Sequence, residues 1–134
     1  MSPTIGTRRY HLLTLLLYLG LAIASTWPLV RDLAHSVPRG TTESTTVPLV
    51  SAWALWWTSD RLPAGFEGYW DAPILHPAQE TFAYSESMTL LGVISAPIFW
   101  LGGTPMLAYN LVLLAALVLN GWMACGLLRA SSAI

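Results

Sequence analysis

The apolar stretch SMTLLGVISAPIFWLGGTPMLAYNLVLLAALVLNGWMACGLL, from Ser87 to Leu128, carries no formal charge. A second stretch without formal charge runs from Tyr10 to Val30 and has only His11 near its start. A bilayer core requires about 20 apolar residues per helix, so the longer stretch predicts two spans and the shorter one predicts one. The sequence therefore predicts an all-α membrane protein with three transmembrane helices.

The longer stretch is divided by the helix-breaking sequence Leu101–Pro105 (LGGTP). The predicted spans are therefore about 10–30, 85–101 and 105–128, in a single membrane module covering 1–134. Pro97 lies within the second span and removes one backbone donor. Asn110 and Asn120 lie within the third, where we expect them to join neighbouring helices rather than to bind a substrate.

The composition agrees with a membrane protein. The chain has 134 residues, of which 54% are hydrophobic and 10% are charged, whereas a soluble domain has about 25% charged residues. The net charge is −1 and there is no basic cluster, so nucleic acid is not an expected partner. Cys125 is the single cysteine, which excludes an internal disulfide and a cysteine-based zinc site.

The arginine pair Arg8 and Arg9 precedes the first span and predicts a cytoplasmic N-terminus. An alternative is a signal peptide, with Ala22–Ala24 as its cleavage site. With an uncleaved first span, segment 31–86 becomes a long extracytoplasmic loop. Three spans then leave Arg129 outside, against the usual bias of positive charge toward the cytoplasm.

This loop contains every acidic residue of the chain: Asp32, Glu43, Asp60, Glu67, Asp71, Glu80 and Glu86. It is also rich in aromatic residues, which disordered segments lack, so we expect it to be folded. The spacing of Leu49, Val50, Trp53, Trp56 and Trp57 makes one apolar stripe on a helix.

We expect this helix to run from Val47 to Leu62, with Thr46 as its cap and Pro48 in its first turn. Two interpretations of the tryptophan stripe stay open. The helix lies along the membrane surface, or its tryptophans pack on neighbouring spans. The following segment, Gly65–Pro77, contains too many prolines and glycines for regular structure, and we expect Tyr69 and Trp70 to anchor it.

Carboxylates near a lipid surface can act as general bases or hold a divalent ion. Three stand out by local context: Glu43 in a small polar stretch, Asp71 next to aromatic residues, and Glu86 at the entrance to the second span. The alternative for most of these charges is a solvated loop position. For Glu86 the alternative is a favourable interaction with the helix dipole.

Four short motifs resemble the N-terminal part of a bacterial membrane-protein group that is similar to the type C (GT-C) glycosyltransferases. They are Trp53–Trp57 (WALWW), Tyr69–Pro77 (YWDAPILHP), Phe82–Glu86 (FAYSE) and Ala108–Leu111 (AYNL). The resemblance covers about Trp27 to Arg129. It implies a polytopic enzyme that takes a sugar from a polyprenyl-phosphate donor and places a catalytic acidic residue in its first extracytoplasmic loop.

The resemblance makes Glu43 the closest positional match for the catalytic residue, with Asp71 as its competitor. Relatives tend to carry an acidic residue directly before the proline of a Pro-Leu-x-x-x-Trp pattern, where this chain has Val47 before Pro48. A divalent metal ion is a candidate cofactor. The candidate substrate-binding side chains are Arg39, Arg61, Trp57, Trp70 and Glu86.

Such enzymes generally have many more than three spans, so the resemblance predicts an N-terminal fragment that is inactive alone and associates with further membrane helices of its own or another chain. The alternative function is that of a small noncatalytic membrane protein, which binds a partner or a lipid through its aromatic loop.

Overall fold

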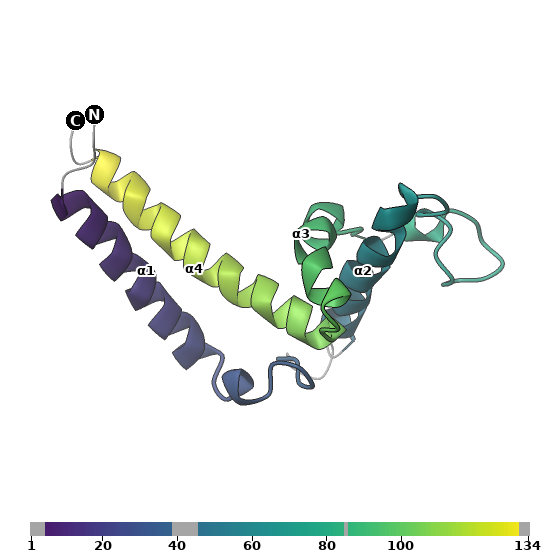
Figure 1. Ribbon diagram of the computed structural model, residues 1–134, viewed down its shortest axis with the longest axis horizontal. Coiled ribbons are helices and arrows are strands. Elements are labelled where there is room, and N and C mark those ends of the chain that lie inside the picture. The colour runs from purple at the N-terminus through teal and green to yellow at the C-terminus, as the bar shows by residue number, and fades with distance from the viewer. Residues whose placement is uncertain (1–4, 39–45, 85, 132–134) are drawn as a thin grey trace. The chain divides into compact units, whose positions relative to one another are not determined.

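The computed structural model of the protein describes residues 5–38, 46–84 and 86–131. Over this part of the chain the structure is helical and contains no strand (Figure 1). The α-helices are α1 (Ile5–Ser25), α2 (Val47–Arg61), α3 (Thr89–Trp100) and α4 (Pro105–Ser131), and the short 3-10 helices are η1 (Leu29–Arg31), η2 (Leu62–Ala64) and η3 (Thr81–Tyr84). The predicted all-helical fold is therefore confirmed for the described residues.

The helices differ in their capacity to cross a membrane. Within the described residues, α4 is the one helix that is both long and apolar enough, with 27 residues and a length of about 40 Å. Helix α1 has 21 residues but includes Arg8 and Arg9, and α3 has only 12 residues. The structure thus supports one candidate span, and the three predicted spans are not confirmed.

The predicted break between the second and third apolar segments is confirmed. Helix α3 ends at Trp100 and α4 begins at Pro105. Gly102 has a φ of +85°, a conformation that residues with a Cβ rarely adopt. The hydroxyl of Thr104 accepts a hydrogen bond of 3.1 Å from the backbone N–H of Leu107, which caps the start of α4.

The chain forms two compact units. The first unit joins the N-terminal segment, through Arg31, to the C-terminal segment from Leu113, and so contains α1 and most of α4. The second unit extends from Asp32 to Val112 and contains α2, α3 and the beginning of α4. Each unit has its own set of contacts.

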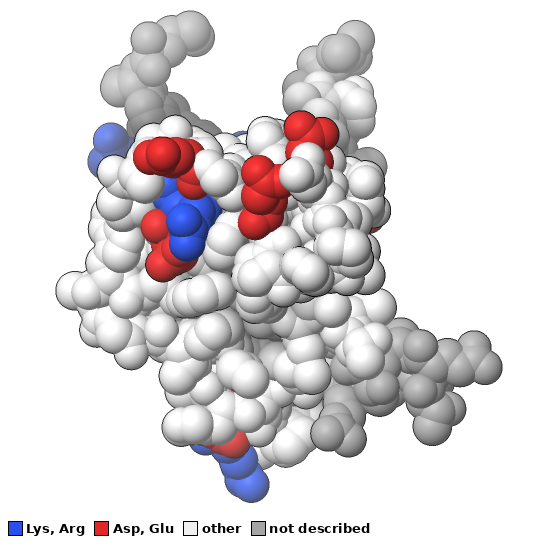
Figure 2. Space-filling model, turned by 90° about the vertical axis from the view of Figure 1, so that its right-hand side faces the viewer, with Lys and Arg blue, Asp and Glu red and all other residues white. Residues whose placement is uncertain are grey.

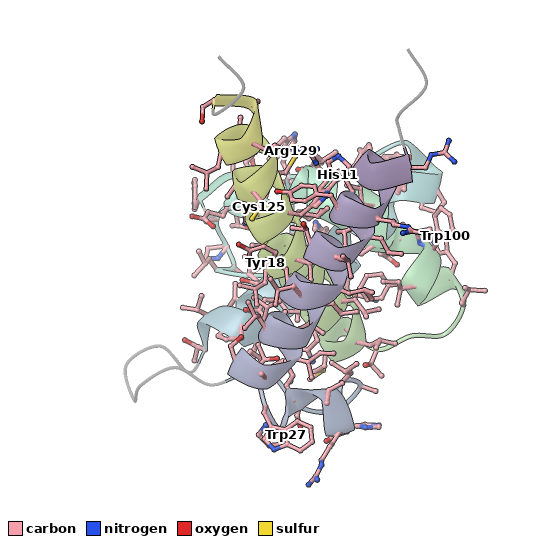
Figure 3. All side chains as sticks on the ribbon, turned by 90° about the vertical axis from the view of Figure 1, so that its left-hand side faces the viewer. His11, Tyr18, Trp27, Trp100, Cys125 and Arg129 are labelled. Atoms are coloured by element: carbon pink, nitrogen blue, oxygen red, sulfur yellow. The ribbon has the colours of Figure 1, made fainter. Side chains whose placement is uncertain are left out.

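In the first unit α1 and α4 run antiparallel and meet through large side chains (Figure 3). The Tyr10 hydroxyl donates a hydrogen bond of 3.3 Å to the Cys125 carbonyl, and the guanidinium of Arg129 stacks 4.4 Å from the centre of the Tyr10 ring. Farther along α1, the Tyr18 hydroxyl lies 3.4 Å from Cys125 Sγ. A Cβ on Gly121 would come within 2.1 Å of the Tyr18 ring, so this glycine lets the ring lie against α4.

A second aromatic contact joins the same two helices. The indole Nε1 of Trp122 donates a hydrogen bond of 3.2 Å to His11 Nδ1, and the two rings meet edge to face with centroids 5.7 Å apart. His11, which the sequence left without a role, thus helps to hold α1 to α4.

In the second unit α2 packs closely against α3. A Cβ added to Gly92 of α3 would lie 2.4 Å from the Cβ of Thr58 on α2, so the two backbones approach as closely as glycine permits. Ser95 and Ala96 are buried on α3, and Ala52 is buried on α2. Small residues of this kind allow helices to approach closely.

The beginning of α4 closes the second unit. The side-chain amide of Asn110 is fully buried and donates hydrogen bonds of 2.8 and 2.7 Å to the carbonyls of Leu33 and Ser36. The Thr104 hydroxyl donates to the carbonyl of Ala34. We expected Asn110 to join two helices, but it instead holds the irregular segment that follows α1.

Candidate functional site

A cluster of aromatic side chains forms the core of the second unit. The cluster, called the aromatic cluster below, consists of Ala54, Trp57, Tyr69, Ala72 and Phe82, with Trp53, Phe66 and Ile74 packed against it. Tyr69 meets both Phe66 and Phe82 edge to face, with ring centroids 5.1 and 4.9 Å apart. Edge-to-face contacts add stability beyond the area that they bury. The loop after α2 is therefore folded, as its composition predicted.

Tyr69 is fixed by hydrogen bonds at both its backbone and its ring. Its carbonyl accepts a bond of 2.9 Å from the Trp57 indole N–H. Its hydroxyl lies 3.2 Å from Thr58 Oγ1 on α2 and 2.7 Å from Thr89 Oγ1 at the start of α3. One side chain thus connects the irregular loop to both helices, and the prediction that Tyr69 anchors this loop is confirmed.

A cavity of about 610 Å³ opens beside the aromatic cluster. The beginning of α2, one loop residue and the segment around η3 form its walls. The lining residues are Thr46, Val47, Val50, Ser51, Trp53, Ala54, Ile74, Phe82, Ala83, Tyr84 and Glu86. The cavity therefore combines apolar and aromatic walls with a few hydroxyl groups and one carboxylate.

The helix that supplies half of this lining begins as predicted. Helix α2 starts at Val47 with Pro48 in its first turn, where the missing proline N–H costs no hydrogen bond. Thr46 occupies the cap position but its side chain makes no capping hydrogen bond. Thr46 is instead one of the residues that line the cavity.

Among the predicted site residues that the structure describes, Glu86 lines the cavity. It is solvent-exposed, and it precedes α3, whose first turn contains no acidic residue. Met88, which adopts a left-handed conformation with a φ of +49°, separates Glu86 from the helix. Glu86 therefore lies just before the first turn of α3 and not within it.

Asp71 has a structural contact outside the cavity lining. Its Oδ1 accepts a hydrogen bond of 2.9 Å from the backbone N–H of Glu80, across the loop. The carbonyl of the preceding Trp70 accepts a bond of 3.0 Å from the backbone N–H of Phe82. Asp71 thus helps to hold two segments of the irregular loop together. Its neighbour Trp70 lies at the edge of the aromatic cluster and is 47% exposed.

Arg61 is already engaged at the end of α2. Its Nη2 forms an ion pair of 2.8 Å with Asp60, and its guanidinium stacks 4.4 Å from the ring centre of Trp57. Figure 2 shows acidic side chains gathered in one area of the displayed face, next to basic atoms. Trp57 is itself buried. The predicted pair of Arg61 and Trp57 therefore has partners within the protein.

Two of the predicted site residues, Glu43 and Arg39, lie outside the described residues. Among the residues that the structure describes, no group of three or more His, Cys, Asp and Glu side chains is placed to hold a metal ion. The divalent metal ion therefore stays a hypothesis without a described ligand set.

Asp32 is the carboxylate whose ionisation the surroundings change most clearly. The Ser36 hydroxyl donates a hydrogen bond of 2.7 Å to its Oδ2, and His35 Nδ1 lies 2.9 Å from its Oδ1. Hydrogen bonds to the charged form, first from Ser36 and then from His35, lower the pKa of Asp32. This local motif orders the turn that follows η1, at a distance in sequence from the cavity residues.

Several lining residues were not singled out by sequence. Ser51 and Tyr84 reach the cavity because α2 turns one side toward the segment around η3. The residues of the predicted apolar stripe on α2 differ in their exposure. Trp57 is buried, Trp53 is partly buried, and Leu49 and Val50 are exposed. The sequence signal that pointed to this segment was the pair of aromatic residues after Thr81, namely Phe82 and Tyr84.

Comparisons with protein-family models, with curated proteins and with solved structures find no match to this chain. The resemblance to GT-C glycosyltransferases therefore continues to rest on the four short motifs, and the activity that it implies is a proposal.

Proposed function

We propose that this chain is the N-terminal module of a GT-C-like membrane glycosyltransferase that uses a polyprenyl-phosphate-linked sugar donor. The observation that carries the proposal is the cavity beside α2, where Glu86, Trp53 and Tyr84 line one space. Ligand sites are typically concave and mostly apolar, with a few polar groups that orient the ligand. A cavity of about 610 Å³ lies within the usual size range of such sites.

The lining chemistry suits a sugar. Aromatic faces pack against the apolar C–H face of a sugar ring, and carboxylate and hydroxyl oxygens bond to its hydroxyl groups. In the proposed reaction the acceptor oxygen bonds to the anomeric carbon, and the bond from that carbon to the phosphate oxygen breaks, releasing polyprenyl phosphate. The general base takes the acceptor proton, which typically contributes about 10²–10⁴-fold to the rate.

We place Glu86 first among the candidate bases because it is the described candidate that lines the cavity. Glu43 stays a proposed alternative. Asp71 ranks third, since it bonds to the backbone of Glu80 and is absent from the lining. As a binding residue, the half-exposed Trp70 is better placed than the buried Trp57.

The donor phosphate needs a different location from the sugar. The described lining contains no lysine or arginine, and a carboxylate repels a phosphate. Arg39 and Arg61 remain the proposed phosphate-binding residues. Arg61 would have to exchange its ion pair with Asp60 for the phosphate.

The proposed setting is the bacterial inner membrane, with a cytoplasmic N-terminus and the second unit on the outer side. Two features support it. Helix α4 is long and apolar enough to cross a bilayer, and the leucines of α1, such as Leu13 and Leu17, are exposed in the isolated chain. Further membrane helices, of this or another chain, are the expected partners.

The test is sugar transfer from a polyprenyl-phosphate donor, in lipid nanodiscs, by the full-length protein of which this chain is the proposed N-terminal module. We expect Glu86→Gln to lower kcat by about 10²-fold or more, Glu43→Gln to show a loss if it shares the role, and Asp71→Asn to retain most activity. Glu67→Gln is the matched control, because Glu67 is exposed in the same unit and is not part of the lining. Full activity of Glu86→Gln would contradict the assignment.

A noncatalytic role, in which the cavity binds a lipid or a partner, is the second candidate. It is favoured by the internal contacts of Asp71 and Arg61, which leave them in structural roles. Binding of polyprenyl phosphate to the nanodisc-embedded protein separates the two candidates. Binding by the full-length protein without any sugar transfer would support the noncatalytic role and contradict the enzymatic one.

A further inference from the structure

Helix α3 has two faces of different character. The side that packs on α2 consists of small residues, among them Gly92, Ser95 and Ala96. The opposite side carries large apolar residues, with Leu90 72% exposed and Ile94 63% exposed. Leu90, Ile94, Pro97 and Leu101 follow one another at helical spacing and form one continuous stripe.

This outward stripe is unusual for a surface in contact with water. From Ser87 to Leu128 the chain has no formal charge, and Trp100 at the end of the helix is 61% exposed. Exposed apolar stripes of this kind mark contact with a membrane or another protein. Tryptophan at the end of such a segment is typical of the headgroup region.

Continuity with α4 favours the membrane as the occupant. Only the residues from Leu101 to Thr104 separate α3 from α4, the helix that is apolar enough to cross a bilayer. If α4 enters the membrane at Pro105, the end of α3 lies at the membrane boundary. Its uncharged stripe then meets lipid without any further element being required.

The length of α3 excludes a full crossing by the helix itself. Its 12 residues extend about 18 Å, whereas the hydrocarbon core is about 30 Å thick. The helix begins at Thr89 after a left-handed residue, Met88, so the chain before it does not prolong the helix.

The arginines of the first unit point to the same conclusion. Arg129 stacks on Tyr10, which places it at the same end of the antiparallel pair as Arg8 and Arg9. If α1 and α4 both cross the bilayer, the chain between them starts and ends on one side. All three arginines then lie on the opposite side, in agreement with the bias of positive charge toward the cytoplasm.

We infer that α3 does not cross the membrane and that its Leu90–Leu101 stripe contacts the acyl chains of the outer leaflet. The chain then has two spans, α1 and α4, with both ends in the cytoplasm and the whole second unit on the outer side. The stripe holds this unit, with its cavity, against the lipid surface. The inference rests on the proposed membrane location.

The topology is tested by single cysteines in a Cys125→Ser background, expressed in intact bacterial cells. Ala78→Cys reports on the exposed loop and Ser131→Cys on the exposed end of α4. A membrane-impermeant maleimide should label Ala78→Cys in intact cells and Ser131→Cys only after permeabilisation. Labelling in denaturing detergent confirms that each cysteine is reactive.

Each outcome has a defined meaning. Labelling of Ala78→Cys outside and Ser131→Cys inside supports the inference, because α4 then accounts for the one crossing between them. The reverse orientation would place the second unit in the cytoplasm and overturns it. Labelling of both positions on the same side shows that α3 also crosses and overturns it. Release of the protein from membranes by alkaline carbonate would instead contradict the proposed membrane location on which the inference rests.

Contact with lipid is tested by a spin label on Ile94→Cys, with Ala78→Cys as the control, in liposomes of bacterial phospholipid. The measured quantity is the ratio of the label's collision rate with oxygen, which concentrates in lipid, to its collision rate with a water-soluble nickel complex. We expect this ratio to be at least several-fold higher for the Ile94 label than for the Ala78 label. Preference for nickel would show that the stripe faces water. Low collision with both reagents would show a protein cover, and either result overturns lipid contact.

Discussion

The two units each contain a pair of α-helices, but side chains of opposite size hold the pairs together. In the second unit α2 and α3 approach through Gly92 and its small neighbours, with the Thr58 side chain directly against the glycine. In the first unit the long side chains of Tyr10, Tyr18 and Trp122 bridge α1 and α4 (Figure 3).

The difference teaches how each pair responds to change. In the close pair an extra methyl group meets a short side chain that is attached directly to the opposite backbone. In the bridged pair an extra methyl group meets the edge of the Tyr18 ring, which can rotate away. The close pair should therefore be more sensitive to an added methyl group than the bridged pair.

The largest effect is expected from Gly92→Ala. The new Cβ would lie 2.4 Å from the Cβ of Thr58, so the helices must separate, at a cost of about 2 kcal/mol in the free energy of unfolding. Gly121→Ala also meets an obstacle, at 2.1 Å, but that obstacle is the Tyr18 ring. We expect a smaller loss there, measured by denaturant titration in detergent micelles.

Gly126→Ala is the matched control for both variants, because a Cβ at this α4 position meets nothing within 4 Å. Alanine is the better helix former, by about 1 kcal/mol, so this variant should be unchanged or slightly more stable. An equal loss in Gly92→Ala and Gly121→Ala would contradict the distinction between the two pairs.

A pair of tyrosine variants sharpens the comparison. Tyr69→Phe removes the hydroxyl that lies within hydrogen-bond distance of both Thr58 and Thr89, which should lower the free energy of unfolding by about 1 to 1.5 kcal/mol. Tyr18→Phe removes one contact to a sulfur atom, a weak partner, and should cost about 0.5 kcal/mol or less. Amide hydrogen exchange can assign each loss to its unit, and a greater effect from Tyr18→Phe would reverse the expected order.

The smallest effect concerns the turn at Asp32. Because its pKa is lowered in the folded protein, ionised Asp32 stabilises the fold above its unfolded pKa of about 3.9, and this contribution is lost as the pH falls through the folded value. Below about pH 4, wild type should therefore lose more stability than Asp32→Asn. Parallel pH profiles of the two proteins, measured by thermal unfolding, would show that the Ser36 and His35 contacts carry no stability.

Much of the helical pattern could be predicted from local signals. Pro48 and the tryptophan spacing placed α2 within one residue of its observed end at Arg61, and the glycines before Pro105 marked the start of α4. The second predicted span was too long, because apolar composition does not show where a helix starts. The predicted span included the described residues 86–88, yet α3 begins only at Thr89.

The candidate site was harder to predict because its residues acquire their roles by tertiary contact. Glu86 lines the cavity and Asp71 binds a loop backbone, yet both are carboxylates next to aromatic residues in the sequence. Arg61 was a candidate substrate-binding residue and is paired with its own neighbour, Asp60. The spacing of residues in the sequence does not distinguish these roles, since each role depends on which residues the folded loop places next to the side chain.

The contacts of Asn110 have a consequence for how the chain is assembled. Its amide joins positions separated by 77 and 74 residues, Leu33 and Ser36, so the second unit begins and ends at the same place. A segment whose ends meet has the geometry of an inserted domain, which a host structure can accept at a single point. The second unit could therefore be transplanted between two neighbouring helices of another protein without stretching either connection.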